Sequence, residues 1–426
     1  MKSLKKVTAL FLLLGITHFI SLQAQELSVV SPEEIGFDGE RLQRLDKAFE
    51  DYVNNDKMGG STILIARKDK VGYYKSFGYQ DIASKTKMKN DAMYRIASQT
   101  KAIISVGIMM LQEEGKLLIQ DAVGDYIPEF KETSVAVAND EGGYTVEKAK
   151  RPITIRDLLT HTAGIGYGYG TGADAWEKAE IQGWYFADRD EPIGATIKRM
   201  GALPMEAQPG ERFVYGYSID ILGVIIEEAS GMPLDVFLKE NIFTPLHMDD
   251  TYFYVPKNKA NRLATVYNPQ ENQTTLQPAP VEGTMDSQGH YLKGPKKSFS
   301  GGAGLVSTAK DYYLFLQMME NKGILNGARL LSPSTVRLMT SNHLASNIWF
   351  TPGRGFGLGF EIVLDEGLSG VPGSEGQFGW GGAYGSTYWV DPKEELIAVY
   401  FTQLRPGSIV KDQQKLRTLI YQALVD

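Results

Sequence analysis

A serine and a lysine three residues apart, Ser98 and Lys101, stand at the start of a long apolar stretch. Residues 102–111 are apolar nearly all round, and this pattern predicts a helix within 94–115 that is buried on every side. Positions i and i+3 share one face of a helix, so the hydroxyl and the amine can meet. Burial disfavours the charged form of an amine. The pair therefore predicts a serine nucleophile that is activated by lysine and not by histidine.

The Ser-x-x-Lys pattern is short, and it recurs elsewhere in the chain. The alternative interpretation of Ser98 is an ordinary helix N-cap. None of the other copies precedes an apolar helix that would bury the lysine: they lie in the leader, in a solvated basic run, at an expected helix N-cap and before an amphipathic helix. These copies are Ser3/Lys6, Ser84/Lys87, Ser307/Lys310 and Ser408/Lys411.

The composition is that of a soluble globular protein with a large core. The 426 residues carry a formal net charge of −7, with 43% apolar and 22% charged side chains. An acidic chain with no basic stripe is a poor nucleic-acid binder, so we expect no such partner. There is no cysteine, and the five histidines are scattered without metal-ligand spacing. We therefore expect no disulfide, metal or cofactor, and the chain also lacks the Gly-x-Ser-x-Gly nucleophile elbow.

The first 24 residues have the pattern of a secretory signal peptide. Three lysines precede an apolar run over 7–20, and a small residue, Ala24, ends the segment. The run is too short for a stable membrane span. We expect cleavage near Ala24, export to the periplasm or the medium, and no membrane span in the mature protein.

The elements that must position the pair come from both ends of the chain. The pattern predicts an α/β fold in which an antiparallel sheet is flanked by an N-terminal and a C-terminal helix. Residues 25–120 and 300–426 would form this discontinuous sheet domain, and 121–299 a mainly helical, loop-rich inserted domain with helices within 153–165 and over 217–230. The expected sheet-domain elements are helices over 38–53 and 410–425, a hairpin of strands 62–67 and 71–79, and strands over 355–364, 382–390 and 395–402.

The order of motifs resembles a known superfamily over roughly residues 30–425. The chain is similar to the serine hydrolases of the class C β-lactamase and penicillin-binding-protein superfamily, and within it to the family VIII esterases. The resemblance implies a β-lactamase/transpeptidase-like fold and catalysis through an acyl-enzyme on Ser98. It is carried by SQTK (98–101), RPITIRDLLTHTAG (151–164), PGERFVYGYSIDILGVIIEEASG (209–231), FSGGAGLVSTAKD (299–311) and GWGGAYGSTYWVDPKEEL (379–396).

A second motif of this superfamily is Tyr-x-Asn, whose tyrosine shuttles a proton. By position it resembles Tyr215-Gly216-Tyr217, so the resemblance implies that Tyr215 is the partner of Lys101 in acid–base chemistry. The alternative is a buried aromatic residue with a satisfied hydroxyl. A literal Tyr-x-Asn at 52–54 precedes the serine on an amphipathic helix, where a packed tyrosine is expected.

The third motif, Lys-Thr-Gly or His-x-Gly, is replaced by Trp380-Gly381-Gly382. The resemblance implies that this segment lines the site and that the backbone N–H groups of Ser98 and Ala383 form an oxyanion hole. The alternative is a glycine-rich kink with a core tryptophan.

Both departures from the motifs suggest an aromatic, apolar mouth that includes Tyr217 and Trp380 and suits an ester with a hydrophobic part. The glycine- and tyrosine-rich run 165–172 forms either a mobile lid over this mouth or a surface loop. His161 is expected to pack and hydrogen-bond within the HTAG turn, without serving as a base.

These features predict an exported serine hydrolase that cleaves a small-molecule carboxylic ester or amide through Ser98, with Lys101 and Tyr215 as the acid–base pair. Which of the two is the base stays open. The alternatives are a β-lactamase or D-alanyl carboxypeptidase/transpeptidase-like enzyme, an acyltransferase that uses an alcohol acceptor, and a non-catalytic cell-wall or glycan-binding protein on the same fold.

Overall fold

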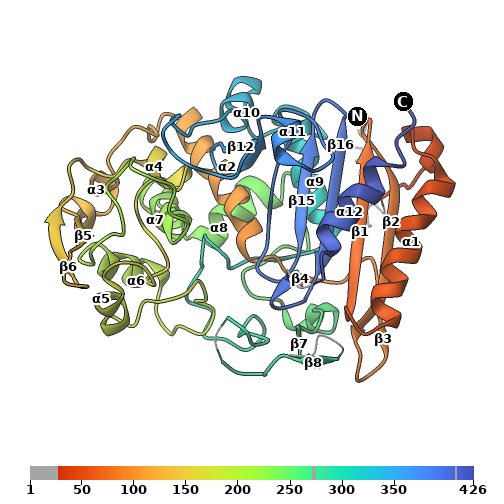
Figure 1. Ribbon diagram of the computed structural model, residues 1–426, viewed down its shortest axis with the longest axis horizontal. Helices are drawn as coiled ribbons and strands as arrows, with labels where there is room; N and C mark the ends of the chain where they lie inside the picture. The colour runs from red at the N-terminus through yellow and green to blue at the C-terminus, as the bar shows by residue number, and fades with distance from the viewer. Residues whose placement is uncertain (1–26, 271–274, 284, 408–409) are drawn as a thin grey trace, which may run out of the picture.

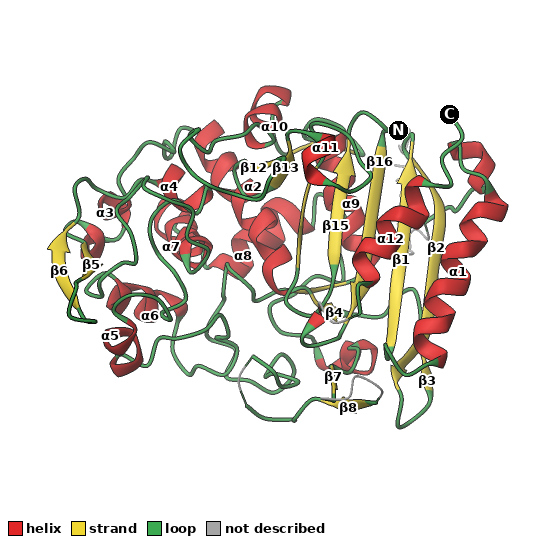
Figure 2. Ribbon diagram, in the orientation of Figure 1, coloured by secondary structure: helices red, strands yellow, loops and turns green. Residues whose placement is uncertain are grey.

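An eight-stranded antiparallel sheet is the central element of the computed structural model, which describes residues 27–270, 275–283, 285–407 and 410–426. The expected signal peptide lies outside the described residues. The strand order is β12-β13-β14-β15-β16-β1-β2-β3. Strands from the C-terminal part of the chain thus continue into strands from its N-terminal part, where β16 pairs with β1 (Figure 2). The strands are β1 (Gly60–Arg67), β2 (Lys70–Asp81), β3 (Thr86–Lys87), β12 (Arg354–Phe356), β13 (Glu361–Val363), β14 (Phe378–Gly381), β15 (Thr387–Asp391) and β16 (Leu396–Thr402).

The two terminal helices, α1 (Gly39–Asn54) and α12 (Asp412–Tyr421), lie side by side on one face of this sheet (Figure 1). Their apolar side chains form one core cluster with outward-facing strand residues such as Trp389 and Tyr400. The opposite face packs in the larger core against α2 (Thr100–Glu113) and α9 (Ala309–Glu320). The predicted antiparallel sheet with flanking terminal helices is thereby confirmed, although α12 is shorter than the expected 410–425.

The segment around Ser98 differs from the single helix expected over 94–115. Residues 94–95 form strand β4, which pairs with β9 (Val306–Ser307), and Ala97–Gln99 form a 3-10 turn before α2 begins. Ala97 has a φ of +43°, which a continuous α-helix does not allow. Beyond this turn the prediction holds, because residues 102–109 and 111 of α2 are buried.

Two of the three late strands are corrected by the structure. The expected strand over 355–364 is a hairpin of β12 and β13, because the chain turns between Gly357 and Phe360. The expected strand over 382–390 starts only at Thr387, since the N–H of Gly385 donates to the carbonyl of Gly382 and closes a turn. Strand β14, directly before this turn, was not predicted.

The chain between α2 and β9 is mainly helical and rich in loops, as expected. Its division from the sheet at residues 120 and 299 stays a prediction. No helix of the described residues has the length and apolar character needed to cross a membrane. Elements not yet named are α3 (Val123–Tyr126), α4 (Ile155–Leu159), α5 (Ala173–Lys178), α6 (Ile193–Met200), α7 (Ser218–Ser230), α8 (Leu234–Leu238), β5 (Ser134–Ala138), β6 (Tyr144–Lys148), β7 (Tyr267–Pro269), β8 (Leu276–Pro278), β10 (Ile324–Leu325), β11 (Ala328–Arg329), α10 (Pro333–Met339) and α11 (Glu366–Ser369).

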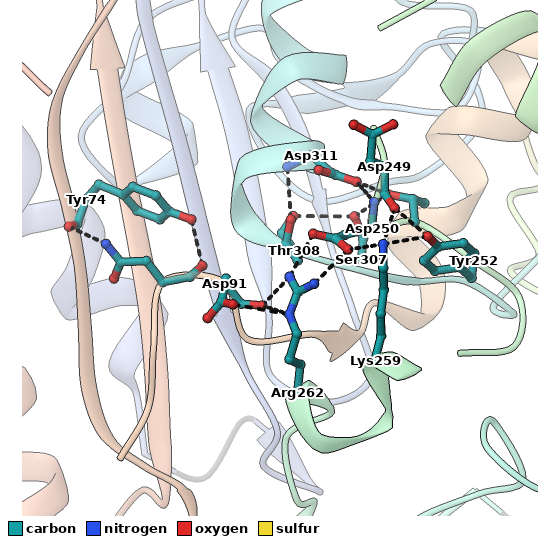
Figure 3. A network of polar contacts seen from close by, with 12 residues as sticks. Tyr74, Asp91, Asp249, Asp250, Tyr252, Lys259, Arg262, Ser307, Thr308 and Asp311 are labelled. Atoms are coloured by element: carbon teal, nitrogen blue, oxygen red, sulfur yellow. Dashed lines mark hydrogen bonds and ion pairs between the residues drawn. The ribbon is translucent and has the colours of Figure 1, made fainter. Parts of the chain in front are cut away.

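A polar network ties the segment after α8 to the start of α9 (Figure 3). Asp250 accepts hydrogen bonds from Lys259 and Arg262 at 2.7–2.8 Å, and its own backbone N–H donates to Asp311 at 2.7 Å. Asp311 lies in the first turn of α9, whose N-cap is Thr308 and not the expected Ser307. The network fixes residues 249–262 against α9, the helix that packs on the sheet.

Candidate active site

The structure brings Ser98 and Lys101 together. The lysine Nζ lies 3.2 Å from the serine Oγ, and Lys101 is 2% exposed although it carries an ionisable amine. Ser98 lies in the 3-10 turn and Lys101 in the first turn of α2, so the two side chains, three residues apart, lie on the same face. This local geometry, together with the buried helix that follows, places the amine against the hydroxyl.

Two further oxygens contact the same amine. The carbonyl of Gly302 accepts a hydrogen bond from Nζ at 2.7 Å, and the phenol oxygen of Tyr167 lies 3.2 Å from it. Burial raises the pKa of Tyr167 well above its usual value, so this phenol is held in its protonated form. Lys101 is thus surrounded by one carbonyl and two hydroxyl groups.

Tyr215 lies on the other side of the amine. Its ring centroid is 4.7 Å from the Lys101 Nζ, and its phenol oxygen accepts a hydrogen bond of 3.0 Å from the indole N–H of Trp380. The tyrosine precedes α7, and the tryptophan is on β14. Trp380, which was expected only to line the site, therefore contacts Tyr215, the predicted proton carrier, directly.

The end of β14 passes close to the serine turn. A Cβ at Gly382 would lie 2.6 Å from the carbonyl oxygen of Ile96, so only glycine allows this approach. Ser98, Trp380, Gly381, Gly382 and Ala383 line one cavity of about 640 Å³, together with Tyr167 and Tyr215. Ser98 and Ala383, whose backbone N–H groups are predicted to form the oxyanion hole, thus line the same cavity. Their role in binding an oxyanion stays a prediction.

A buried carboxyl group holds the loop that carries the Gly302 carbonyl. Asp220 Oδ1 accepts from the Ser300 hydroxyl at 2.6 Å and from the Gly302 N–H at 3.0 Å. Burial raises the pKa of Asp220, and the charge of Lys101 acts in the opposite direction. Asp220 therefore orients the loop whose Gly302 carbonyl accepts a hydrogen bond from the Lys101 amine. No signal in the sequence pattern singled out Asp220.

His161 packs beside the site without a polar contact. Its ring lies 4.6 Å from the ring of Tyr215, and it is fully buried. Burial lowers its pKa well below the usual value, and Lys101 lowers it further, so the imidazole is neutral. The packing is confirmed, but neither ring nitrogen has a hydrogen-bond partner among the described residues, in contrast to the expectation.

The structure places Tyr217 in the core and not at the mouth of the site. The residue is 0% exposed, its hydroxyl donates to the carbonyl of Gly183 at 2.6 Å, and its ring stacks on Trp176. The prediction that Tyr217 lines the mouth of the site is wrong, because the start of α7 directs this side chain into the core. Aromatic rings from Tyr167, Trp184, Tyr215 and Trp380 line the cavity instead.

Tyr167 is the site residue that sequence reasoning missed. It lies in the glycine- and tyrosine-rich run 165–172, which was interpreted as a lid or a surface loop. A tyrosine three residues after the HTAG turn was the available signal. The neighbouring Tyr169 is 60% exposed, and whether the run moves stays a prediction.

Comparisons with known proteins identify the family and the fold. The sequence model of the Beta-lactamase family, described as Beta-lactamase, matches residues 45–422. Protein Rv1367c of Mycobacterium tuberculosis is 34% identical over 370 residues, covering 82% of this chain and 86% of that protein. Esterase EstB of Burkholderia gladioli is 27% identical and covers 84% and 89%. The solved structure of "EstCE1, a hydrolase with promiscuous acyltransferase activity" has a TM-score of 0.76 and 26% identity, covering 90% and 99%.

Proposed function

The chain belongs to the β-lactamase family and is a serine hydrolase, and from this premise we propose that it cleaves carboxylic esters through an acyl-enzyme on Ser98. The contact of 3.2 Å between the Ser98 Oγ and the buried Lys101 Nζ carries the proposal. A buried amine beside a hydroxyl is an arrangement that activates a serine.

The surroundings of Lys101 support its role as the base. A neutral amine has two N–H donors and one lone pair. In the proposed reactive state the Gly302 carbonyl and the Tyr167 oxygen accept these two donors, and the lone pair takes the hydroxyl proton of Ser98. The same three oxygens can accept the three N–H donors of the ammonium that forms, so the contacts suit Lys101 both before and after the transfer.

The proposed reaction proceeds in two steps. The Ser98 oxygen bonds to the ester carbonyl carbon while its proton passes to Lys101, and the oxyanion is stabilised by the N–H groups of Ser98 and Ala383. The C–O bond of the leaving alcohol then breaks, and Tyr215 protonates the alkoxide and regains its proton from Lys101. Water attacks the acyl-enzyme by the same route and releases the carboxylic acid.

An ester suits this site better than a β-lactam does. The motif position that carries a cation in the family pattern is Trp380 here, and its N–H is used by Tyr215. Esterase EstB, a relative by name and sequence, supports the same substrate class. Export after removal of residues 1–24 is part of the proposal, and N-terminal sequencing of protein from the producing cells would test it.

The test uses a matched pair of serines. Ser84 belongs to a Ser-x-x-Lys copy at an exposed turn, where its hydroxyl donates to Asp81 at 2.7 Å. We expect S98A to lose at least about 10³-fold in turnover of p-nitrophenyl butyrate and S84A to retain it. A fluorophosphonate should label wild type and S84A, as intact-mass spectra would show, but not S98A. Full turnover by S98A would refute the assignment, and failure of any probe to label Ser98 would favour the non-catalytic binding protein.

A second candidate activity is acyl transfer to an alcohol. EstCE1 is described as a hydrolase with promiscuous acyltransferase activity, and it is 26% identical to this chain. An acyl-enzyme partitions between water and any alcohol that reaches it. Product analysis with a vinyl ester and increasing 1-butanol would show a growing share of butyl ester, whereas rapid nitrocefin turnover would favour the β-lactamase alternative.

A further inference from the structure

The cavity at Ser98 continues along the outer face of strand β14. Directly opposite residues of neighbouring strands point to the same face. Glu361 pairs with Gly379, and Gly379 pairs with Trp389, so these three share the face that α12 partly covers. Gly381 and its partner Thr387 continue the same face toward the serine, and all five line the cavity.

Glycine at 379 and 381 leaves the floor of this groove without side chains. One wall is α12, which contributes Gln413, Gln414 and Arg417, and the other is formed by the β12–β13 hairpin. The groove can therefore hold an extended chain that runs from the serine toward the hairpin.

The far end of the groove is positively charged. The charged side chains that line the cavity are Arg354, Glu361 and Arg417. Arg354 and Glu361 form an ion pair with each other, which leaves Arg417 as the uncompensated charge of the lining.

Arg417 contacts only neutral acceptors in the described part of the chain. It donates to the side-chain oxygen of Gln377 at 2.7 Å and to the carbonyl of Pro372 at 3.2 Å, and its guanidinium lies 4.2 Å from the Trp389 ring centroid. A guanidinium has five N–H donors, so donors are left for a ligand. The carboxyl group of Asp391 accepts from Tyr421 at 2.7 Å and from the Ser374 N–H at 3.1 Å.

The surroundings of Arg417 disfavour its charged form. Burial lowers the pKa of Arg417 to about 10; the charge of Arg354 acts in the same direction, whereas Tyr421, Glu361 and Asp391 act against it. A carboxylate that enters the groove would replace lost water and counter both effects. Planar guanidinium groups bind carboxylates with two parallel hydrogen bonds.

We propose that the substrate carries a carboxylate remote from the scissile ester and that Arg417 binds it in the groove along β14. The inference rests on the proposed esterase function and names its substrate class: esters whose acyl or alcohol part ends in a carboxylate. Arg354 and Glu361 form the polar end of the same subsite, and Gly379 and Gly381 let the connecting chain pass.

The test compares esters that differ only in a terminal carboxylate. In the acyl arm, p-nitrophenyl hydrogen adipate and suberate are compared with the hexanoate and octanoate, after subtraction of spontaneous hydrolysis. In the alcohol arm, 6-acetoxyhexanoate is compared with hexyl acetate. We expect a charged ester to exceed its neutral partner by about tenfold in kcat/KM in one arm. Equal or lower values for the charged esters in both arms would overturn the inference.

Variants of α12 then assign the preference to a residue. R417Q should reduce the charged-to-neutral ratio to about one, and R417K should keep part of it, because an ammonium retains the charge without the fork. The control K415Q removes a charge from the same helix outside the cavity and should keep the full ratio. A ratio that survives R417Q, or that K415Q removes equally, would refute the role of Arg417. Hydrolysis of neutral esters without a carboxylate preference would refute this inference alone, whereas no hydrolysis in either arm would refute the esterase function itself.

Discussion

The indole N–H of Trp380 donates a hydrogen bond of 3.0 Å to the phenol oxygen of Tyr215, and the two rings lie 5.5 Å apart. Trp380 stands where the family pattern carries a cation. A neutral donor at this position stabilises negative charge on the phenol without offering a charge to a substrate carboxylate near the serine. The contact connects β14, an inner strand of the sheet, to the segment before α7 that contains Tyr215, the proposed proton carrier.

Replacing Trp380 by phenylalanine removes the donor and keeps an aromatic ring. We expect W380F to lose about tenfold in kcat/KM for p-nitrophenyl butyrate, since a hydrogen bond to a group that gains charge contributes roughly 1.5–3 kcal/mol. W184F, a change at an indole that lines the same cavity, should keep the wild-type kcat/KM.

The two tyrosines near Lys101 are expected to differ in importance. Y215F should lose about 10²–10³-fold in kcat, because general acid–base catalysis contributes on that scale. Y167F should lose about tenfold, since its phenol oxygen only orients the amine. Steady-state kcat for an alkyl ester such as ethyl butyrate, whose alkoxide must gain a proton as it leaves, would measure both. A larger loss in Y167F than in Y215F would reverse the assignment of the proton carrier.

Periodicity and spacing predicted the parts of the site that depend on local geometry. The apolar run after Lys101 could be assigned to a buried helix. A separation of three residues brings Ser98 and Lys101 together in a continuous α-helix and also across the junction found here, with Ser98 in the 3-10 turn and Lys101 in α2. The two terminal helices and the β1–β2 hairpin could also be predicted, because amphipathic and strand patterns depend on local periodicity.

The contacts that depend on tertiary packing could not be predicted from these patterns. Tyr167 lies in an irregular loop, which has no periodicity to show that it reaches the lysine. Strand β14 is short and contains two glycines, so its sequence has little strand character. The position of Tyr217 in a motif indicated proximity to the site, but the direction of its side chain is decided by its packing on Trp176 of α5.

Removing the hydroxyl of Tyr217 tests its placement in the core. Y217F leaves the carbonyl of Gly183 without its donor, and an unsatisfied buried acceptor costs about 1–3 kcal/mol. We expect a lower free energy of unfolding in urea but an unchanged KM for neutral esters of different size. A KM that rises with the size of the ester would restore Tyr217 to the mouth of the site.

Asp311 is expected to make stability fall as the pH rises toward 7. Burial raises its pKa to about 7, and the nearby charge of Asp250 contributes to the increase, while the Asp250 N–H and the Thr251 hydroxyl act against it (Figure 3). A carboxyl group whose pKa is higher in the folded than in the unfolded state stabilises the fold at low pH. That contribution is lost as the pH rises through the folded value.

Asparagine at position 311 keeps an acceptor oxygen but does not titrate. Between pH 5.5 and 7.5 the free energy of unfolding of wild type should therefore fall by roughly 2 kcal/mol more than that of D311N, from about 1.4 kcal/mol per pH unit of differential protonation. Glu320, whose pKa burial also raises to about 7, remains in both proteins and cancels in the comparison. Urea titrations at the two pH values would measure the difference, with D140N as the control for an exposed carboxylate outside the network. Equal slopes for wild type and D311N would show that Asp311 is already ionised at pH 5.5 in the fold.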